Sequence, residues 1–342
     1  MEKVKLAPTL QEVSRLAFGS LTVSPLQASP DIETASDIIA YAFERGVNFI
    51  DTAQYYKNYP IIRRAFEKFG GAGDVVLSTK TYAYDRAGAE AAVEEARRET
   101  GRDVIDIFML HEQESYETLR GHMEALEYLF ECKSRGIIRA VGASMHHVAA
   151  VKGVVTLAKR GIKLDVIHPI YNKSGIGIVD GGVADMAAAV AEAHSLGIGV
   201  FGMKALAGGH LTSTAAEAFD FVLDSTFIDA VAVGMQSFSE VDANIEYFTR
   251  RSFSREHEEK LREKKRSLHV EEYCEGCGAC VKRCPVHAMS LVEADNSDSG
   301  EIFENGGEFV RTYTHRAVCD PDKCVLCGYC SGVCPVFAVK VY

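Results

Sequence analysis

Short apolar runs alternate with amphipathic stretches along residues 1–252. Each run is bounded by Gly or polar residues, as buried strands are, and the stretches between them, such as 33–46 and 119–136, carry apolar residues at helical spacing. Several stretches end at a Gly, which is typical of a helix C-terminus: Gly46, Gly101, Gly136, Gly161 and Gly197. The pattern predicts eight strands, at 16–21, 47–53, 75–80, 105–111, 138–144, 164–171, 198–204 and 230–235.

Eight strand–helix repeats are the number that closes a (β/α)8 barrel, an α/β fold of the TIM-barrel type. A doubly wound sheet fits less well, because no G-x-G-x-x-G follows the first strand. We expect the barrel to span residues 1–252. The segment 250–270, RRSFSREHEEKLREKKRSLH, has Glu and Lys or Arg at helical spacing, which predicts a solvated helical connector over 253–270. Residues 271–342 would then form a second, smaller domain.

Composition narrows the range of partners. The chain has 342 residues, of which 47% are hydrophobic and 25% charged, as in ordinary soluble globular proteins. Its formal net charge of −11 disfavours nucleic acid as a partner. No apolar run approaches the roughly 18 residues of a membrane span, and the N-terminal MEKVKLAPTLQEV lacks the apolar segment of a secretory signal. We therefore expect a cytoplasmic protein with no membrane partner.

Cysteine is concentrated in the tail. Nine of the ten Cys residues fall at or after Cys274, and only Cys132 lies in the body, where we expect it to pack within a helix. In a reducing cytoplasm, clustered Cys residues usually bind metal rather than form disulfides. Two runs in the tail have the spacing C-x-x-C-x-x-C-x-x-x-C-P, which is the bacterial ferredoxin-type ligand run for 4Fe–4S clusters.

In two-cluster ferredoxins the last Cys of each run binds the other cluster. One predicted ligand set is therefore Cys274, Cys277, Cys280 and Cys334, and the other is Cys324, Cys327, Cys330 and Cys284. A zinc site is the alternative, but zinc commonly takes two C-x-x-C pairs rather than two complete four-Cys runs. Cys319 lies between the runs and is expected to be a free or buried thiol. The tail thus resembles the two-cluster bacterial ferredoxins, which implies a small α+β electron-transfer domain in an anaerobic setting.

Polar residues near the ends of the predicted barrel strands are informative, because barrel active sites lie at the C-terminal ends of the strands. Asp51 lies near the end of the second strand and Tyr56 follows it, while Lys80 and His111 end the third and fourth. Singly, each has a structural explanation, such as a capped loop or a satisfied buried His. Four titratable residues on three adjacent strands instead predict an active site.

Four segments resemble the aldo-keto reductase family: NFIDTAQYY (48–56), VVLSTK (75–80), IDIFMLH (105–111) and IIRAVGAS (137–144). The resemblance covers nearly all of residues 10–250. It implies a catalytic tetrad of Asp, Tyr, Lys and His at Asp51, Tyr56, Lys80 and His111. The family interval of five residues from the Asp selects Tyr56 over its neighbour Tyr55.

The chemistry that the resemblance implies is NAD(P)H-dependent interconversion of a carbonyl and an alcohol. Hydride addition to a carbonyl carbon leaves negative charge on the oxygen, which then needs a proton. A free Tyr has a pKa of about 10, and the ammonium of Lys80, held by Asp51, is expected to lower the pKa of Tyr56. Tyr56 would be the general acid in reduction or the base in oxidation. His111 would donate a hydrogen bond to the substrate oxygen.

The resemblance also implies a nicotinamide cofactor at the barrel mouth. Ser144 would hold the carboxamide, whereas the family's next Asn is Met145 here, its Gln on strand six is His168 and its stacking aromatic is Met203. His168 is either a polar replacement, which we favour, or a new acid–base group. The full predicted set is Gly19, Ser20, Ser144, Met145, His168, Met203, Lys204, Leu206, Gly234, Met235, Gln236, Ser237, Glu240 and Asn244.

The residues at the adenosine end bear on the choice of cofactor. Where NADPH-preferring relatives carry Lys and Arg, this chain has Gly234 and Glu240. A carboxylate repels a 2′-phosphate and accepts a hydrogen bond from a ribose 2′-OH, so we expect a preference for NADH. His146 and His147 are expected to be solvated surface residues at the start of a helix.

Three functions are consistent with these features. The first is an iron–sulfur oxidoreductase that uses NAD(P)H on a small carbonyl or alcohol substrate. The second is a reductase to which a ferredoxin or other redox protein delivers electrons through the clusters, without nicotinamide. The third is a non-enzymatic electron-transfer protein, against which the complete tetrad argues. Because few residues separate His111 from the next predicted helix, we expect the tail to help cover the barrel mouth.

Overall fold

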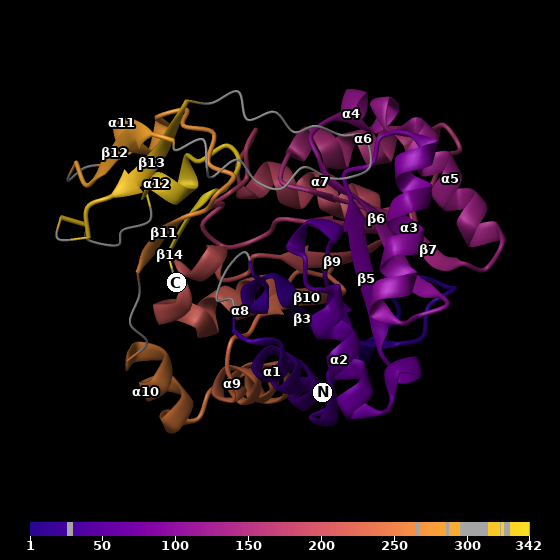
Figure 1. The fold of residues 1–342 in the computed structure, drawn as a ribbon, viewed down its shortest axis with the longest axis horizontal. Helices are drawn as coiled ribbons and strands as arrows, with labels where there is room; N and C mark the ends of the chain where they lie inside the picture. The colour runs from indigo at the N-terminus through magenta and orange to yellow at the C-terminus, as the bar shows by residue number, and fades with distance from the viewer. Residues whose placement is uncertain are drawn as a thin grey trace.

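The computed structural model describes residues 1–25, 30–263, 267–284, 287–294, 314–321, 323–324 and 329–341. Eight parallel strands close into a barrel in the order β10-β3-β4-β5-β6-β7-β8-β9, and helices surround it (Figure 1). Each of the eight predicted strands is present, with ends shifted by one or a few residues. The barrel strands are β3 (Leu16–Gly19), β4 (Phe49–Asp51), β5 (Val76–Thr81), β6 (Ile105–Gln113), β7 (Ile138–Met145), β8 (Val166–Pro169), β9 (Gly199–Met203) and β10 (Ala230–Gly234).

The helices of the barrel follow the predicted alternation, and the five Gly residues expected to end helices all have positive φ. One prediction is wrong: the stretch 119–136 is not a single helix. It breaks at His122, whose ring Nδ1 lies 2.7 Å from the carbonyl oxygen of Thr118. The helices are α1 (Ile32–Glu44), α2 (Tyr59–Phe69), α3 (Arg86–Thr100), α4 (Tyr116–Gly121), α5 (Met123–Ser134), α6 (Val148–Lys159), α7 (Val183–Ser195), α8 (Ala215–Leu223) and α9 (Phe238–Arg250).

Apolar side chains bury both faces of the barrel strands. The inner cluster fills the barrel with residues such as Phe49 and Phe201, whose rings meet edge to face at 5.0 Å. Leu6 and Leu10 join this cluster, and the antiparallel pair β1 (Lys3–Val4) and β2 (Val13–Ser14) lies beside them in the N-terminal segment. The outer cluster packs the helices onto the strands and includes Cys132, which is fully buried as predicted. Strands buried on both faces explain the continuous apolar runs in the sequence.

The C-terminal region is a small α+β domain. It follows α10 (Arg255–Glu263), which agrees with the predicted helical connector, and contains α11 (Ala279–Arg283) and α12 (Tyr329–Gly332). Two antiparallel strand pairs form its sheets: β11 (Leu268–Val270) with β14 (Val339–Val341), and β12 (Met289–Glu293) with β13 (His315–Cys319). Because β11 pairs with β14, the sheet structure of this domain begins at Leu268, inside the segment expected to be the connector.

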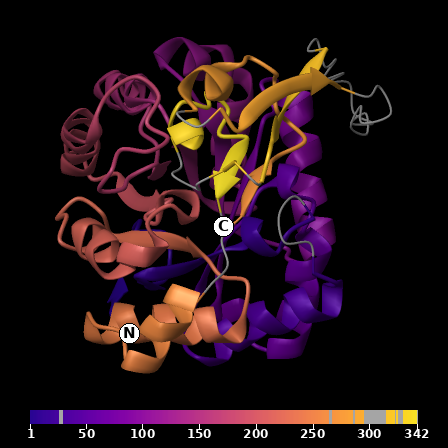
Figure 2. The same ribbon diagram turned by 90° about the vertical axis from the view of Figure 1, so that its left-hand side faces the viewer.

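The C-terminal domain lies against one end of the barrel. β14 packs beside the short 3-10 turn η4 (Ala207–Gly209), which follows β9. Figure 1 shows β11 and β14 between the barrel and the rest of the domain, and in Figure 2 the C-terminal domain faces the viewer. This end is the one toward which the barrel strands run, so the domain sits over the carboxyl ends of the strands. Within the described ranges, no helix has the length and apolar character needed to cross a membrane.

Close backbone packing at the other end of the barrel gives a test of the fold. A Cβ added to Gly199 would lie 2.0 Å from the carbonyl oxygen of Leu6. Since the obstacle is backbone, a side-chain rotation cannot relieve it, and we expect Gly199→Ala to lower the free energy of unfolding by about 1–3 kcal/mol. Urea denaturation followed by circular dichroism measures this change. The control is Gly121→Ala, at the end of α4, where no atom lies within 4 Å of the added Cβ; equal stability of both variants would contradict the packing.

Candidate functional site

The centre of the site is an ion pair buried at the ends of two neighbouring strands. Asp51 ends β4, and Lys80 lies one residue before the end of β5. Nζ of Lys80 lies 2.9 and 2.8 Å from the two carboxylate oxygens of Asp51, and it donates to the carbonyl oxygen of Thr52 at 2.6 Å. Lys80 is 1% exposed and Asp51 is 4% exposed. Oxygen atoms of the protein therefore take the place of the water that would otherwise hydrate the ammonium.

Charge and burial oppose each other in this pair. Burial alone would raise the pKa of Asp51, but Lys80 and His168 outweigh it and hold the pKa far below its ordinary value. Burial lowers the pKa of Lys80, and Asp51 opposes that shift. His168 is fixed beside the pair: its Nε2 lies 3.5 Å from Asp51 Oδ2, its Nδ1 lies 2.6 Å from the carbonyl oxygen of Phe201, and its ring stacks on Phe201. His168 thus helps to keep the Asp51 carboxylate ionised.

Tyr56 and His111 lie next to the ion pair, so the structure brings the four predicted residues together. Tyr56 ends the 3-10 turn η2 (Gln54–Tyr56); Lys80 Nζ lies 5.1 Å from the centre of its ring, and the ring of His111 meets it edge to face at 5.7 Å. Burial lowers the pKa of His111 well below its ordinary value, and Lys80 adds to that shift. The imidazole is therefore neutral at pH 7.

The expected lowering of the Tyr56 pKa is wrong. Burial raises that pKa well above 10, and the negative charges of Asp51 and Glu112 raise it further. The main physical reason is burial of the phenol, and the Lys80 ammonium, which is hydrogen-bonded to Asp51 and Thr52, does not reverse the shift. Tyr56 is consequently a phenol at neutral pH.

The end of β6 is irregular where it reaches the barrel mouth. Its pairing register with β7 shifts there, and Glu112 has a left-handed φ of 47°. Such irregularities redirect side chains beside active sites. The carboxylate of Glu112 accepts a hydrogen bond from the Tyr82 hydroxyl at 2.5 Å, and the ring of Tyr82 stacks on His111 at 4.4 Å. Sequence reasoning missed both residues, although Tyr82 lies two positions after Lys80 and Glu112 adjoins His111.

Lys204 lies at the mouth after β9. Its φ is 58°, its Nζ lies 3.0 Å from Nε2 of His146, and the centre of the Phe337 ring is 3.7 Å from the same Nζ. Burial lowers the pKa of Lys204 to about 7. The expectation that His146 is solvated is wrong: it is only 9% exposed, because Lys204 and Phe337 lie beside it.

Two aromatic side chains of the C-terminal domain contact the mouth. Phe337 fits against Gly177 and Gly208, where an added Cβ would lie 2.9 and 3.1 Å from its ring. Tyr273 meets Tyr55 edge to face with ring centres 6.1 Å apart. The expectation that the tail helps cover the barrel mouth is confirmed for the described residues. Tyr273, which adjoins Cys274, and Phe337, which closely follows Cys334, were not predicted as part of the site.

Several residues assigned to a nicotinamide cofactor are already engaged or buried. The Ser144 hydroxyl oxygen accepts a hydrogen bond from the Glu112 backbone N–H at 2.8 Å. Ser20 donates its hydroxyl to the carbonyl oxygen of Asp51 at 2.8 Å. Met145 and Met235 are fully buried in the outer apolar cluster. Met203 and Leu206 are half-buried at the edge of that cluster.

The predicted adenosine end lies at the start of α9. Ser237 caps this helix by accepting from the Glu240 backbone N–H, and the Glu240 carboxylate accepts from the Gln236 backbone N–H at 2.7 Å. Asn244 is buried and donates its side-chain amide to the Glu240 carbonyl oxygen. Nearby, Gly19 and Gly234 are paired between β3 and β10. The residues expected at this end therefore do lie together.

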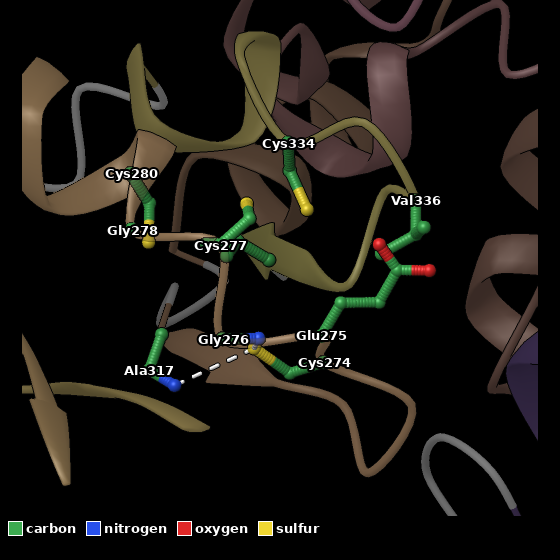
Figure 3. A pocket seen from close by; sticks show the side chains of 10 residues that line it. Cys274, Glu275, Gly276, Cys277, Gly278, Cys280, Ala317, Cys334 and Val336 are labelled. Carbon is green, nitrogen blue, oxygen red and sulfur yellow. Dashed lines mark hydrogen bonds between the residues drawn. The ribbon is translucent and has the colours of Figure 1, made fainter. Parts of the chain in front are cut away.

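One predicted ligand set surrounds a cavity in the C-terminal domain, shown in Figure 3. Cys274, Cys277, Cys280 and Cys334 line a partly open space, which we call the sulfur-lined cavity. Backbone N–H groups of Gly276 and Ala317 donate to the sulfur of Cys274 at 3.5 and 3.4 Å, and that of Ala338 donates to Cys334 at 3.1 Å. These are the contacts that stabilise thiolate ligands of an iron–sulfur cluster. The residues present fit such a group.

The geometry of this cavity differs from a single-ion site. Among the described residues, no three Cys, His, Asp or Glu side chains converge as ligands of one metal ion. The sulfurs instead surround a space, as a cluster of several atoms requires. Gly276 makes this turn possible: its φ is 62°, and a Cβ there would lie 2.2 Å from the carbonyl oxygen of His315.

The second predicted set is described in part. Cys284, Cys324 and Cys330 are placed, whereas Cys327 lies outside the described residues. The Ala288 backbone N–H donates to the sulfur of Cys284 at 3.2 Å. The half-buried thiol of Cys319 lies 3.7 Å from the carbonyl oxygen of Asp320 and near Cys324, Cys330 and Cys284. Cys319 therefore borders the second set.

Comparison with known proteins agrees with this geometry. Residues 15–220 match the model of the Aldo/keto reductase family, and residues 256–338 match that of the 4Fe-4S dicluster domain. The structure accordingly has a buried Lys–Asp pair beside Tyr and His at the barrel mouth, and a cysteine-lined cavity in the domain that follows the barrel. The chain belongs to the aldo/keto reductase family and carries a 4Fe-4S dicluster domain after the barrel.

Individual relatives match one part each. An aldo-keto reductase of Mycolicibacterium paratuberculosis is 31% identical over 117 residues, which are 33% of this chain and 40% of that protein. A polyferredoxin-like protein of Methanocaldococcus jannaschii is 34% identical over 70 residues, 20% of this chain and 37% of that protein. The chain covers less than two thirds of the length of the mycobacterial aldo-keto reductases that it matches.

Solved structures show the same barrel fold. The holo form of an aldo-keto reductase from Bacillus halodurans has a TM-score of 0.60 at 22% identity, covering 76% of this chain and 96% of that chain. A Bombyx mori aldo-keto reductase in complex with NADP has a TM-score of 0.59 at 15% identity, covering 76% and 91%.

The buried ion pair predicts a large and pH-dependent effect of Lys80→Met. The substitution leaves the Asp51 carboxylate buried without its counter-charge, so the free energy of unfolding should fall by about 3–5 kcal/mol at pH 7. In the wild type the Asp51 pKa is depressed, so its stabilising contribution is present above about pH 4 and is lost as the pH falls further. The variant should instead gain stability as the pH falls, because protonation removes the unpaired charge.

Urea denaturation at several pH values measures both effects. The control is Lys159→Met, which removes an exposed ion pair with Glu192 at 2.6 Å and should cost less than about 1 kcal/mol. If the two variants lose the same free energy of unfolding, the Lys80–Asp51 pair does not contribute more to stability than an exposed ion pair.

Proposed function

We propose that this protein reduces a small carbonyl compound to the alcohol at the tetrad Asp51, Tyr56, Lys80 and His111, and that the reverse oxidation uses the same residues. The observation that carries this proposal is the position of Tyr56 and His111 beside the buried Lys80–Asp51 pair, where burial raises the pKa of Tyr56 and lowers that of His111. NAD(P)H, when bound, supplies the hydride that adds to the carbonyl carbon. The other half of the reaction is delivery of a proton to the oxygen, which is the task of the protein.

Tyr56 is the proton donor in this proposal. Its raised pKa keeps the phenol protonated across the neutral range, which suits donation more than abstraction. The Lys80 ammonium lies 5.1 Å from the centre of the Tyr56 ring and keeps the Asp51 carboxylate paired, so that this charge is not left uncompensated beside the phenolate. The neutral His111 imidazole has one N–H, which donates a hydrogen bond to the developing negative charge on the substrate oxygen.

Residues near the strand ends would hold the cofactor. Ser144 and Lys204 would lie along the nicotinamide and diphosphate, and Gln236, Ser237 and Glu240 would meet the adenosine end. The Glu240 carboxylate, close to the start of α9, favours a ribose hydroxyl over a 2′-phosphate. NADH is therefore the expected donor. The two predicted Cys sets, with Cys327 completing the second, would hold two 4Fe–4S clusters that exchange electrons with a redox partner.

A second candidate function is favoured by the covered mouth. In it, a ferredoxin-type donor supplies the electrons through the C-terminal domain, and no nicotinamide is required. Phe337 lies on Lys204, Ser144 accepts from Glu112, and Met145 and Met235 face the apolar core, which leaves fewer groups for a nicotinamide. The tetrad keeps its proton-donating role in this candidate.

Removing the Tyr56 hydroxyl tests the shared part of both candidates. Tyr56→Phe should lower the rate of anaerobic aldehyde reduction by about a hundredfold or more, because general-acid catalysis contributes at least that factor. In the wild type, the rate should show no loss from Tyr56 ionisation below pH 10, since the pKa is raised above that value. Alcohol formation is measured by gas chromatography between pH 6 and 10. Tyr84→Phe, at a tyrosine that is 60% exposed, is the control; a wild-type rate in Tyr56→Phe would exclude the proposed role.

Calorimetric titration of the anaerobic protein tests the cofactor preference. NADH should bind more tightly than NADPH. Glu240→Gln should reduce this difference in affinity, because it removes the charge that repels the 2′-phosphate. Binding of NADPH about tenfold tighter than NADH, a difference of about 1.4 kcal/mol, would contradict the preference. Absence of binding by either nucleotide would leave only the second candidate.

A further inference from the structure

The C-terminal domain meets the barrel through segments that border the sulfur-lined cavity. Tyr273 directly precedes Cys274, and Phe337 follows Cys334 by three residues. Both of these Cys residues line the cavity. The segments that carry these two Cys residues therefore also contact the barrel mouth.

A series of ring contacts leads from this cavity to the tetrad. Tyr273 meets Tyr55 with ring centres 6.1 Å apart, and Tyr55 meets Tyr82 at 5.9 Å. Tyr82 stacks on His111 at 4.4 Å with an interplanar angle of 26°, and His111 meets Tyr56 at 5.7 Å. Every step is in the range of a direct aromatic contact. The series begins next to a predicted cluster ligand and ends on the residue that donates the proton.

These rings are not ordinary core packing. Tyr82 is 42% exposed, and Tyr55 and Tyr273 are half-buried at the contact between the two domains. Each end is held by polar contacts: the Tyr82 hydroxyl donates to Glu112, and Lys340 Nζ lies 5.4 Å from the centre of the Tyr273 ring. Glu112 reaches Tyr82 from the irregular end of β6, where the backbone adopts the left-handed conformation. These polar contacts hold partly exposed rings in fixed positions, which the packing of a hydrophobic core does not explain.

We propose that three rings, Tyr273, Tyr55 and Tyr82, form the electronic contact between the sulfur-lined cavity and the tetrad. Electron transfer through protein weakens steeply with distance and is strongest across packed side chains, so a continuous series of rings is the favoured route. The inference rests on the proposed reduction of a carbonyl compound at the tetrad and deepens its second candidate. It makes the substrate an acceptor of single electrons that arrive from the C-terminal domain.

The reaction balances when the carbonyl group takes up two electrons and two protons and becomes the alcohol, with one new C–H bond and one new O–H bond. The two predicted Cys sets would each hold a cluster that supplies one electron, and a low-potential one-electron carrier of the ferredoxin class would replace both electrons. Tyr56 donates the proton that forms the O–H bond. Water at the mouth supplies the proton that forms the C–H bond and the one that returns to Tyr56. Two one-electron carriers thus match the two-electron demand of one carbonyl group.

Matched variants at Tyr273 test the route. The anaerobic full-length protein is reduced with dithionite, freed of excess reductant and mixed with benzaldehyde without nucleotide. Decay of the electron paramagnetic resonance signal of the reduced clusters gives the rate, and chromatography gives the alcohol formed. Tyr273→Leu, which removes the ring, should slow the decay by about tenfold or more. Tyr273→Phe, which keeps the ring, should remain close to the wild type, as should Tyr84→Leu outside the series.

A second readout separates loss of the route from loss of the clusters. The midpoint potentials and spectra of the clusters, followed by paramagnetic resonance during a redox titration, should be the same in Tyr273→Leu and wild type. The wild type should form one alcohol for every two clusters oxidised. Tyr55→Leu gives an independent check at the next ring and should show the same slow decay.

The outcomes are distinguishable. Wild-type decay rates in Tyr273→Leu and Tyr55→Leu, with a large loss in Tyr56→Phe, would overturn the route and leave the proposed reduction intact. Reduced clusters that benzaldehyde does not oxidise, in a protein that still reduces it with NADH, would also overturn the route. Absence of benzaldehyde reduction with either electron source, unchanged by Tyr56→Phe, would instead remove the proposed function on which the route rests.

Discussion

The site depends on keeping a lysine ammonium charged where water does not reach it. Lys80 achieves this because Asp51 and the Thr52 carbonyl oxygen take the place of its hydration shell. The same arrangement determines the state of its neighbours. Since the ammonium is directed at Asp51, burial controls the pKa of Tyr56 and keeps the phenol protonated. His168 belongs to this arrangement as well, since it contacts the Asp51 carboxylate from β8.

Much of the barrel was predictable because its strands are buried on both faces. Such strands appear as uninterrupted apolar runs, and Gly residues with positive φ mark where the helices end. Asp51, Lys80 and His111 were recognisable because each is a polar residue near the end of such a run. The break at His122 was not, because the apolar periodicity does not reveal where a helix is interrupted.

The missed features of the site all depend on three-dimensional contacts. The direction of the Tyr56 pKa shift follows from burial of the phenol and from the nearby charges of Asp51 and Glu112, which spacing along the chain does not specify. His146 is buried because Phe337, far along the chain, lies beside it with Lys204. Tyr82 belongs to the site because its hydroxyl donates a hydrogen bond to Glu112, whose backbone is left-handed. A pattern of apolar residues predicts a regular strand and does not reveal this irregularity. Sequence therefore brought out the four residues of the predicted tetrad better than their surroundings.

The pairing of β11 with β14 has a consequence for how such a protein arises. The strand that enters the C-terminal domain lies hydrogen-bonded to the strand near its other end, and both lie on the side that faces the barrel. A unit whose two ends emerge together is easily gained or exchanged as a module, since the host needs only one point of attachment. A family barrel can in this way acquire a redox domain over its mouth without any change in the order of its own strands.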